Sequence, residues 1–488
     1  MNQKCTLVKH RGVFNYTTQS IYFLTLLSLD APIAKEDNGC QPILKPVIME
    51  LIQAFSLFIP MIIFGAALIL IAFEVVDKAL IALGGALAVI FLRFITPEEA
   101  LLAVDFETII LLMSMMILVE ISRDSGLFSW LNVKLVSVTK GNPLVIAIIF
   151  SLITALFSAF LDNVSTIIIV VPITIELFKG LGRDPKPIIL QEILMSNMGG
   201  ALTLIGDPTN IIIGGEAKLT FNDFITNLYL PVGVAILTLL IIFVIVRWQQ
   251  LKPIDKNLKT LFLSTILIRK LRYEFLNIEV SKNFIIKSIA ILLITLVAFA
   301  FQIQLQLPIY ILALAGALAL SILSVRQTKL HNILQRVEWT TLLFFAGLFI
   351  MVAAIEKTGL LEQISLLITS ISNDFTIILL IVLWASAIIS MMLDNIAFVT
   401  VMIPVILGIQ ENIPNEPNLQ MLWWALALGA VMGGSGSLIG SSANIVGVDL
   451  AKKHGVNIGF IEHFKYAFPL AILALGISSA WILYRLTF

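Results

Sequence analysis

The motif Leu161-Asp162-Asn163 interrupts the apolar segment 143–178, and Leu393-Asp394-Asn395 interrupts a second apolar segment, 375–410. Each segment has 36 residues, and a single α-helix of that length would measure roughly 54 Å. The hydrocarbon core of a bilayer is only about 30 Å thick. We therefore predict that each segment forms a re-entrant hairpin, which enters and leaves the membrane on one side and carries Asp-Asn at its tip.

The composition of the whole chain also indicates a membrane protein. Of its 488 residues, 59% are hydrophobic and 13% are charged, whereas soluble domains average about 45–50% apolar and 25% charged residues. The net charge of zero gives no indication of a nucleic-acid partner. Two cysteines and four scattered histidines predict no metal site. The sequence contains no phosphate-binding loop and no paired nucleophile and base, so neither an ATPase nor an enzyme is predicted.

Outside the two hairpins, ten stretches have the length and apolar character of a membrane crossing. They are 52–74, 79–96, 104–121, 187–214, 224–247, 285–303, 307–325, 337–355, 419–446 and 462–485. We divide the chain into a tail that is signal-like or disordered, a first transporter repeat, a cytoplasmic linker rich in Lys and Arg, and a second repeat. The tail is 1–50, the first repeat 51–249, the linker 250–284 and the second repeat 285–488.

The two halves of the chain contain the same features in the same order, which indicates an internal repeat. Chance similarity of apolar runs explains matching leucines, but it does not explain ordered polar, proline and glycine positions. The matching positions, separated by 232 or 234 residues, are Asp162-Asn163 and Asp394-Asn395, Pro172 and Pro404, Gly199-Gly200 and Gly433-Gly434, Gly206 and Gly440, and Asn210 and Asn444.

The charges of the loops predict that the repeats have opposite orientations. Lys179, Arg183 and Lys186 follow the first hairpin, whereas Glu411 and Glu416 follow the second. By the positive-inside rule, the first hairpin opens to the cytoplasm and the second to the outside. The predicted fold is an all-α polytopic membrane protein with two inverted repeats, each of about five transmembrane helices plus a re-entrant hairpin, as in many secondary transporters.

Four polar clusters are expected in the membrane core, at the two hairpin tips and at breaks in the crossing helices 187–214 and 419–446. Irregular backbone at that depth is tolerated only where it is buried in protein or lines an aqueous cavity. We expect these clusters to form the substrate and ion site. Its candidate residues are Asp162, Asn163, Ser165, Thr166, Asn197, Gly206, Asp207, Thr209, Asn210, Asp394, Asn395, Gly440, Ser441 and Asn444.

The two hairpin aspartates are the candidates for binding a coupling ion or proton. An ionised Asp at the bilayer centre costs about 2.5–3.5 kcal/mol on insertion scales, so such residues are usually functional. A cap that accepts hydrogen bonds from the amides of the tip is the structural alternative, and both roles are compatible. Asp207 has a stronger structural alternative, because Asp-Pro is common in turns and the corresponding residue is Ser441.

These motifs resemble those of the ion transporter superfamily, in particular the branch of arsenite permeases and P proteins, which is related to NhaD-type sodium/proton antiporters. The resemblance runs from about residue 50 to the C-terminus and rests on Leu161–Thr166, Asn197–Gly200, Leu204–Asn210, Leu393–Ala397 and Ser437–Asn444. It implies a scaffold domain, usually dimeric, and a transport domain that moves like an elevator.

The related divalent anion and sodium symporters differ at the hairpin tips. They carry Ser-Asn-Thr where this chain has Asp162-Asn163-Val164 and Asp394-Asn395-Ile396. Because an acid at each tip repels a dianion unless a cation or proton intervenes, this difference argues against a dicarboxylate substrate.

The expected function is secondary active transport of a small inorganic ion or oxyanion-like solute, coupled to protons or sodium, with no other cofactor. A sodium/proton antiporter is one alternative, and a passive anion channel is an alternative of a different class. The expected partners are the solute, membrane lipid and a second copy of the chain. We expect a multi-pass protein of the plasma membrane, the inner membrane of the cell.

Overall fold

The computed structural model describes residues 58–71, 76–128, 130, 134, 138–139, 142–252 and 282–487. The predicted tail, and all of the predicted linker except its two ends, lie outside these residues. The described part of the chain is helical and contains no strand. Eight of its helices are long and apolar enough to cross a membrane, and the bent pair α4 and α5 would make a ninth. These findings confirm the predicted all-α membrane fold.

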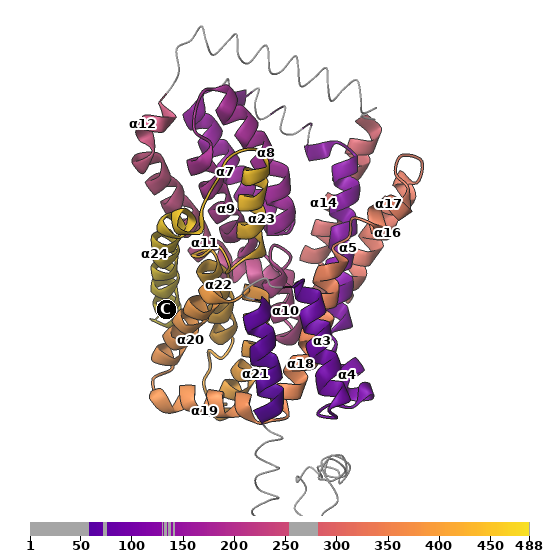
Figure 1. Cartoon of the computed structure of the whole chain (residues 1–488), viewed down its shortest axis with the longest axis vertical. Helices are drawn as coiled ribbons and strands as arrows, with labels where there is room; N and C mark the ends of the chain where they lie inside the picture. The colour runs from indigo at the N-terminus through magenta and orange to yellow at the C-terminus, as the bar shows by residue number, and fades with distance from the viewer. Residues whose placement is uncertain are drawn as a thin grey trace, which may run out of the picture.

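The first helix of the described residues is Phe58–Ile71, which carries no label in Figure 1. The helices that follow it are α3 (Lys78–Phe91), α4 (Pro97–Ala103), α5 (Phe106–Asp124), α7 (Pro143–Phe160), α8 (Asn163–Gly180), α9 (Lys186–Gly200), α10 (Pro208–Glu216), α11 (Phe221–Val246) and α12 (Trp248–Leu251).

The described helices of the second half run from α14 onward. They are α14 (Lys282–Ala300), α15 (Gln302–Leu305), α16 (Ile309–Ser324), α17 (Leu330–Leu334), α18 (Trp339–Glu356), α19 (Leu360–Ile371), α20 (Phe375–Met392), α21 (Asn395–Asn412), α22 (Met421–Gly434), α23 (Ser442–Lys453) and α24 (Phe460–Thr487). The series α7 to α11 thus corresponds to the series α20 to α24, as the internal repeat predicts.

The first predicted hairpin consists of α7 and α8, which the extended residues Leu161 and Asp162 join. Ile146, near the start of α7, shares a buried apolar cluster with Leu177 and Phe178, near the end of α8. The open ends of the two arms therefore lie together, away from the tip. Each arm has 18 residues, or about 27 Å, so length alone would also have permitted a crossing.

The second hairpin, α20 and α21, has the same construction, with the break at Leu393 and Asp394. The α7–α8 hairpin lies in the upper part of Figure 1 and the α20–α21 hairpin in the lower part. Residues from both tips nevertheless line one cavity. Two hairpins that come from opposite ends and meet at their tips each span only part of the bundle. Their orientation relative to a bilayer stays a prediction.

The two long stretches 187–214 and 419–446 are broken helices, as predicted. α9 ends at Gly200 and α10 begins at Pro208, while α22 ends at Gly434 and α23 begins at Ser442. α9 from Ile188 onward and all of α22 are buried, so these two helices form the centre of the fold. In this position every backbone group freed at the break must find a partner within the protein.

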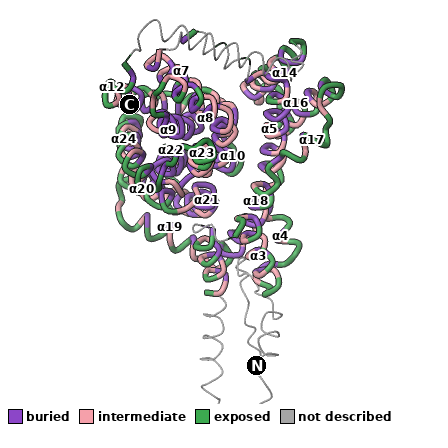
Figure 2. The backbone as a smooth tube through the Cα atoms, turned by 45° about the horizontal axis from the view of Figure 1, so that its top comes forward, coloured by how far each residue is buried: buried purple, intermediate pink, exposed green. Residues whose placement is uncertain are grey.

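The helices form two groups, which Figure 2 separates clearly. The hairpin group contains α7 to α11 and α20 to α24. The arm group contains α3 to α5 and α14 to α18. In the arm group, helices of opposite halves pack together, α5 on α16 and α3 on α18. In the hairpin group, α8 packs on α23 and α21 packs on α10. Each group is therefore built from both repeats.

Two matching glycines allow each hairpin to pack closely on its broken helix. A Cβ atom on Gly199 of α9 would lie 2.0 Å from the carbonyl oxygen of Ala155 in α7. A Cβ atom on Gly433 of α22 would lie 2.4 Å from the Cα atom of Ala387 in α20. Only glycine permits these distances between the helix backbones, as is common for helix pairs in membranes.

We predict that Gly199→Ala destabilises the protein, because the added methyl group must push α7 away from α9. Overpacking in a core costs about 1–3 kcal/mol, and here the neighbour is backbone that has little freedom to move. The measurement is the thermal midpoint of unfolding of the purified protein in detergent. Gly233→Ala in α11 is the matched control, since its Cβ atom would have no neighbour within 4 Å. Equal stability of the two variants would contradict this packing.

Candidate functional site

The N-termini of four helices meet at one place between the hairpin group and the arm group. α8 and α21 begin at the hairpin tips, and α10 and α23 begin after the breaks in the long helices. Residues from all four starts line a cavity of about 340 Å³, which is within the range of small-molecule sites. Helix N-termini carry partial positive charge, so the cavity lies where four such ends concentrate it.

Three of the four helix starts are capped by an aspartate. Asp162 accepts a hydrogen bond from the amide of Ser165 at 2.8 Å, and Asp394 accepts one from the amide of Ile396 at 2.9 Å. Asp207 accepts hydrogen bonds from the amide and the hydroxyl of Thr209, at 2.9 and 2.6 Å. The structural role foreseen for these acids is therefore present at all three positions.

The fourth start, that of α23, has no such cap. Ser441 makes no side-chain hydrogen bond to the first turn of α23. Its hydroxyl instead donates to Oδ1 of Asn197 at 2.9 Å. The first amides of α23 thus have no side-chain acceptor at the Ser441 cap, unlike the other three starts.

Buried amide side chains join the two halves behind the cavity. Asn163 at the first tip donates to Oδ2 of Asp207 at 2.9 Å and to Oδ1 of Asn197 at 3.3 Å. Asn197 in turn donates to Oδ1 of Asn444 at 2.7 Å. All four residues have at most 4% of their surface exposed. A buried network with this many satisfied groups fixes the relative position of the first tip and both breaks.

Asn210 and Asn444 hold the irregular backbone at the two breaks. Asn210 donates to the carbonyl oxygens of Gly200, Ala201 and Thr203, at 3.2, 3.3 and 2.9 Å. Asn444 donates to those of Gly434 and Ser437, at 3.0 and 2.6 Å, in the matching arrangement. The same geometry in both repeats therefore satisfies carbonyl groups that lose their helical partners where each helix ends.

The structure divides the predicted site residues into two sets. Those that line the cavity are Asp162, Asn163, Asp207, Asn395 and Ser441. Those that are not among its lining residues are Ser165, Thr166, Asn197, Gly206, Thr209, Asn210, Gly440 and Asn444. Asp394 is not a lining residue, but its carboxylate lies beside the side chains of two residues that are, Lys78 and Ser442.

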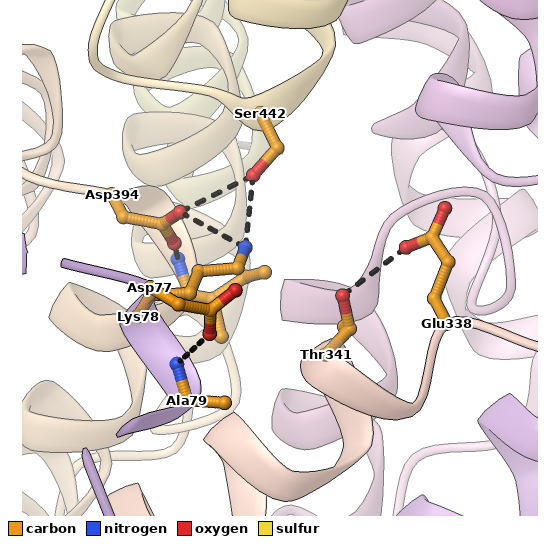
Figure 3. Close-up of polar contacts among 8 residues, drawn as sticks. Asp77, Lys78, Ala79, Glu338, Thr341, Asp394 and Ser442 are labelled. Atoms are coloured by element: carbon orange, nitrogen blue, oxygen red, sulfur yellow. Dashed lines mark hydrogen bonds and ion pairs between the residues drawn. The ribbon is translucent and has the colours of Figure 1, made fainter. Parts of the chain in front are cut away.

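Lys78, one of these two residues, is a site residue that was not predicted from the sequence. Its Nζ atom lies 3.9 Å from Oδ2 of Asp394 and 3.2 Å from the hydroxyl of Ser442. It also lies 5.2 Å from the ring centroid of Phe344, a cation–π distance. Figure 3 shows the amine, the Asp394 carboxylate and the Ser442 hydroxyl each in contact with the other two. Lys78 begins α3 in the arm group, so this contact joins the two groups of helices.

The second missed residue is Glu338, which precedes α18 in the arm group and also lines the cavity. It accepts a hydrogen bond from the hydroxyl of Thr341 at 3.1 Å, on the side of Figure 3 away from Asp394. Lys78 and Glu338 both lie at helix starts, where a charged residue is usually interpreted as a helix cap or a loop residue. Their only sequence signal is a charge directly beside an apolar stretch.

The lining residues give the cavity an acidic character. Three acids, Asp162, Asp207 and Glu338, and one lysine, Lys78, reach it, and Asp394 adds a further carboxylate at the edge. Four helix N-termini and Lys78 partly balance this charge. The arrangement suits a cation or proton at the acids, with an anion tolerated only near Lys78 and the start of α23.

Comparison with known proteins places the chain in a family of transporters. The family model described as "Citrate transporter" matches residues 68–429. The crystal structure of the YdaH transporter of Alcanivorax borkumensis has the same fold, with a TM-score of 0.50 and 14% identity. That match covers 77% of this chain and 84% of the other.

Three curated relatives are similar over most of this chain. The "46 kDa membrane protein" of Mycobacterium leprae is 32% identical, and the match covers 85% of this chain and 96% of that protein. An "Uncharacterized transporter" of Mycobacterium tuberculosis is 33% identical, and the match covers 87% of this chain and 97% of that protein. The human P protein is 31% identical over 85% of this chain, which spans 58% of that protein.

These matches confirm the predicted relation to P proteins and the prediction of a transporter rather than an enzyme. The relation to arsenite permeases, NhaD-type antiporters and dicarboxylate symporters stays a prediction. The chain belongs to the citrate transporter family and is an integral, multi-pass membrane transporter of a small solute.

Proposed function

We propose that the chain is a secondary active transporter of a small inorganic ion or oxyanion-like solute, coupled to protons or sodium. The observation that carries this proposal is the cavity between the two helix groups, which acids at three helix starts and one lysine line. Carboxylates that lie at membrane depth can bind a proton or a cation. Asp162 and Asp394 at the tips would bind the coupling ion.

The proposed place for the solute is the region of Lys78 and the start of α23. Ser441 leaves the first amides of α23 without a side-chain cap, and Lys78 lies 3.2 Å from the next residue, Ser442. Amides at a helix start together with a cation can hold an oxyanion. The neighbouring acids disfavour an anion until they bind protons or cations, which provides a reason for coupling.

We further propose that transport proceeds by an elevator motion, in which the hairpin group moves against the arm group. The contact of Lys78 with Asp394 and Ser442 crosses between the groups, so a sliding motion would break it. A dimer formed through the arm group, in contact with lipid, fits this proposal, because exposed apolar residues of α14 and α16 such as Ile294, Val297 and Ile322 offer surface for either.

A sodium/proton antiporter is the second candidate. It is favoured by the excess of acids over lysines around the cavity. A screen in proteoliposomes with arsenite, silicate, chloride, sodium and citrate, under imposed proton and sodium gradients, separates the candidates. Citrate belongs in the screen because the family description names it, although the acids should repel it. Sodium flux driven by a pH gradient alone would favour the antiporter. Failure of every solute to accumulate would favour a channel.

We predict that Asp162→Asn and Asp394→Asn each abolish coupled accumulation and leave membrane insertion intact. Asn can still accept the capping hydrogen bond, but it neither ionises nor holds a proton. The measurement is accumulation in proteoliposomes at equal protein content. Asp449→Asn, on the exposed face of α23 where Asp449 pairs with Lys453, should transport like the wild type, since surface ion pairs contribute little. Normal accumulation in both tip variants would refute the role of the tips.

We predict that Lys78→Met lowers the KM for the coupling cation by about tenfold, because Asp394 loses the cation beside it and a tenfold change corresponds to about 1.4 kcal/mol. Lys78→Arg should keep a KM near that of the wild type. The measurement is the rate of uptake against the concentration of sodium or protons. Lys453→Met, which removes an exposed lysine of α23, is the control. An unchanged KM in Lys78→Met would show that this lysine does not compete for the site.

A further inference from the structure

The helices α9 and α22 occupy matching places in the two repeats but differ in chemistry. Both are buried along their length and both end in Gly-Gly. Four buried polar residues of α9 have apolar counterparts 234 residues later in α22. The pairs are Gln191 and Ala425, Glu192 and Leu426, Ser196 and Ala430, and Asn197 and Val431. Because α22 fills its place with apolar residues, packing alone does not require the polar residues of α9.

The same difference extends to the helix that packs beside α9. In α8, Thr166 and Thr174 are buried, and the residues 232 positions later in α21 are Phe398 and Ile406. The polar residues of the first repeat therefore lie on two adjacent helices, α8 and α9. They form a polar region on these two helices, and the residues at the matching positions of α21 and α22 are apolar.

Glu192 is the ionisable residue of this region. Its side chain is 0% exposed, and its Oε1 atom accepts a hydrogen bond from the hydroxyl of Thr174 at 2.6 Å. Its Oε2 atom has no hydrogen-bond partner among the described residues. An ionised carboxylate in such surroundings would lack the partners that a buried charge requires. The neutral, proton-bearing form is the one that this environment favours.

No charged group of the neighbouring helices compensates Glu192. α7 and α22, which pack on α9, have no titratable side chain. The titratable residues of the other helices packed on α9 are Glu176 and Lys179 of α8, Asp223 and Tyr229 of α11, Asp449, Lys452 and Lys453 of α23, and Glu462, His463, Lys465, Tyr466, Tyr484 and Arg485 of α24. Of these, only His463 is buried, and none forms an ion pair with Glu192 in the part of the chain described.

Hydrogen bonds connect this region to the cavity. Ser196, one turn after Glu192 on α9, donates to the carbonyl oxygen of Asn163 at 2.9 Å, and the Asn163 side chain donates to Asp207. On the other side, the hydroxyl of Tyr466 in α24 donates to Oε1 of Gln191 at 2.5 Å. Polar side chains thus follow α9 from Tyr466 to the acids at the cavity.

We infer that Glu192 is a proton-binding site of the transporter, separate from the acids that line the cavity. The bound proton converts the carboxylate to a neutral carboxyl group and removes one negative charge from the hairpin group. A metal cation would require several oxygen ligands, whereas Glu192 has one hydroxyl beside it, and no group of three His, Cys, Asp or Glu residues exists in the described chain. The coupling role of this proton rests on the proposed function.

The first test requires no transport. Infrared spectra of the purified protein at neutral pH should contain the carbonyl band of a protonated carboxyl group that disappears in Glu192→Gln. The band should remain in Glu176→Gln, the matched control, because Glu176 is on the exposed face of α8. If Glu192→Gln leaves the spectrum unchanged, Glu192 is ionised and the inference is wrong, whatever the transporter carries.

The second test uses proteoliposomes and whichever solute of the screen the wild type accumulates. In Glu192→Gln, accumulation driven by a pH gradient should fall by about tenfold or more, as expected for loss of a proton-transfer group. Exchange of labelled for unlabelled solute at equal pH should persist. Glu192→Asp, which keeps a carboxyl group, should retain coupling with a shifted pH profile.

Two results of the transport test would overturn the coupling role of this proton. One is accumulation by Glu192→Gln at the level of the wild type. The other is an equal loss of exchange and accumulation in both Glu192→Gln and Glu192→Asp, which would indicate a role of the side chain in packing. If the wild type shows no accumulation under a pH gradient, the proposed function fails, and the infrared result still decides whether Glu192 binds a proton.

Discussion

The need to satisfy backbone groups inside the membrane determines the rest of this structure. Each repeat interrupts two helical segments at depth, once at a hairpin tip and once in a long helix, and the freed amides and carbonyls have no water to bind. Aspartates accept from the amides at three helix starts, and Asn210 and Asn444 donate to the carbonyls at the two breaks. The residues that make the site polar are thus the same ones that make its backbone possible.

The hairpins, the breaks and the repeat could be predicted from the sequence, because each produces a polar or glycine signal inside an apolar run and each occurs twice. Lys78 and Glu338 could not be predicted as site residues, since they reach the cavity from the arm group and resemble ordinary residues at helix starts. Glu192 lies within the predicted crossing 187–214, and the sequence does not single it out because one acid does not disturb the apolar pattern. In the fold, Thr174 is the one residue that donates a hydrogen bond to Glu192 among the described residues. This environment distinguishes Glu192 from an acid at the exposed end of a helix.

The two repeats share a fold but divide the chemistry unequally. Both have a glycine contact between hairpin and broken helix, and both have an asparagine at the break. Asp207 corresponds to Ser441, and Asn197 corresponds to Val431. One consequence is visible in the hydrogen bonds: Oδ1 of Asn444 accepts from Asn197, whereas Oδ1 of Asn210 has no partner among the described residues. The two repeats share the scaffold, but four of the six ionisable residues described above, Lys78, Asp162, Glu192 and Asp207, belong to the first repeat, and Glu338 and Asp394 belong to the second.

The amide network also has a consequence for the order of folding during synthesis. Asn163 emerges from the ribosome before Asn197 and Asp207, which lie 34 and 44 residues later in the chain. Asn197 then depends on Asn444, which follows after 247 residues. Until the end of the second repeat is made, the first repeat lies in the bilayer with polar groups that its own sequence does not satisfy. Its final packing is therefore a late event, completed only when nearly the whole chain has entered the membrane.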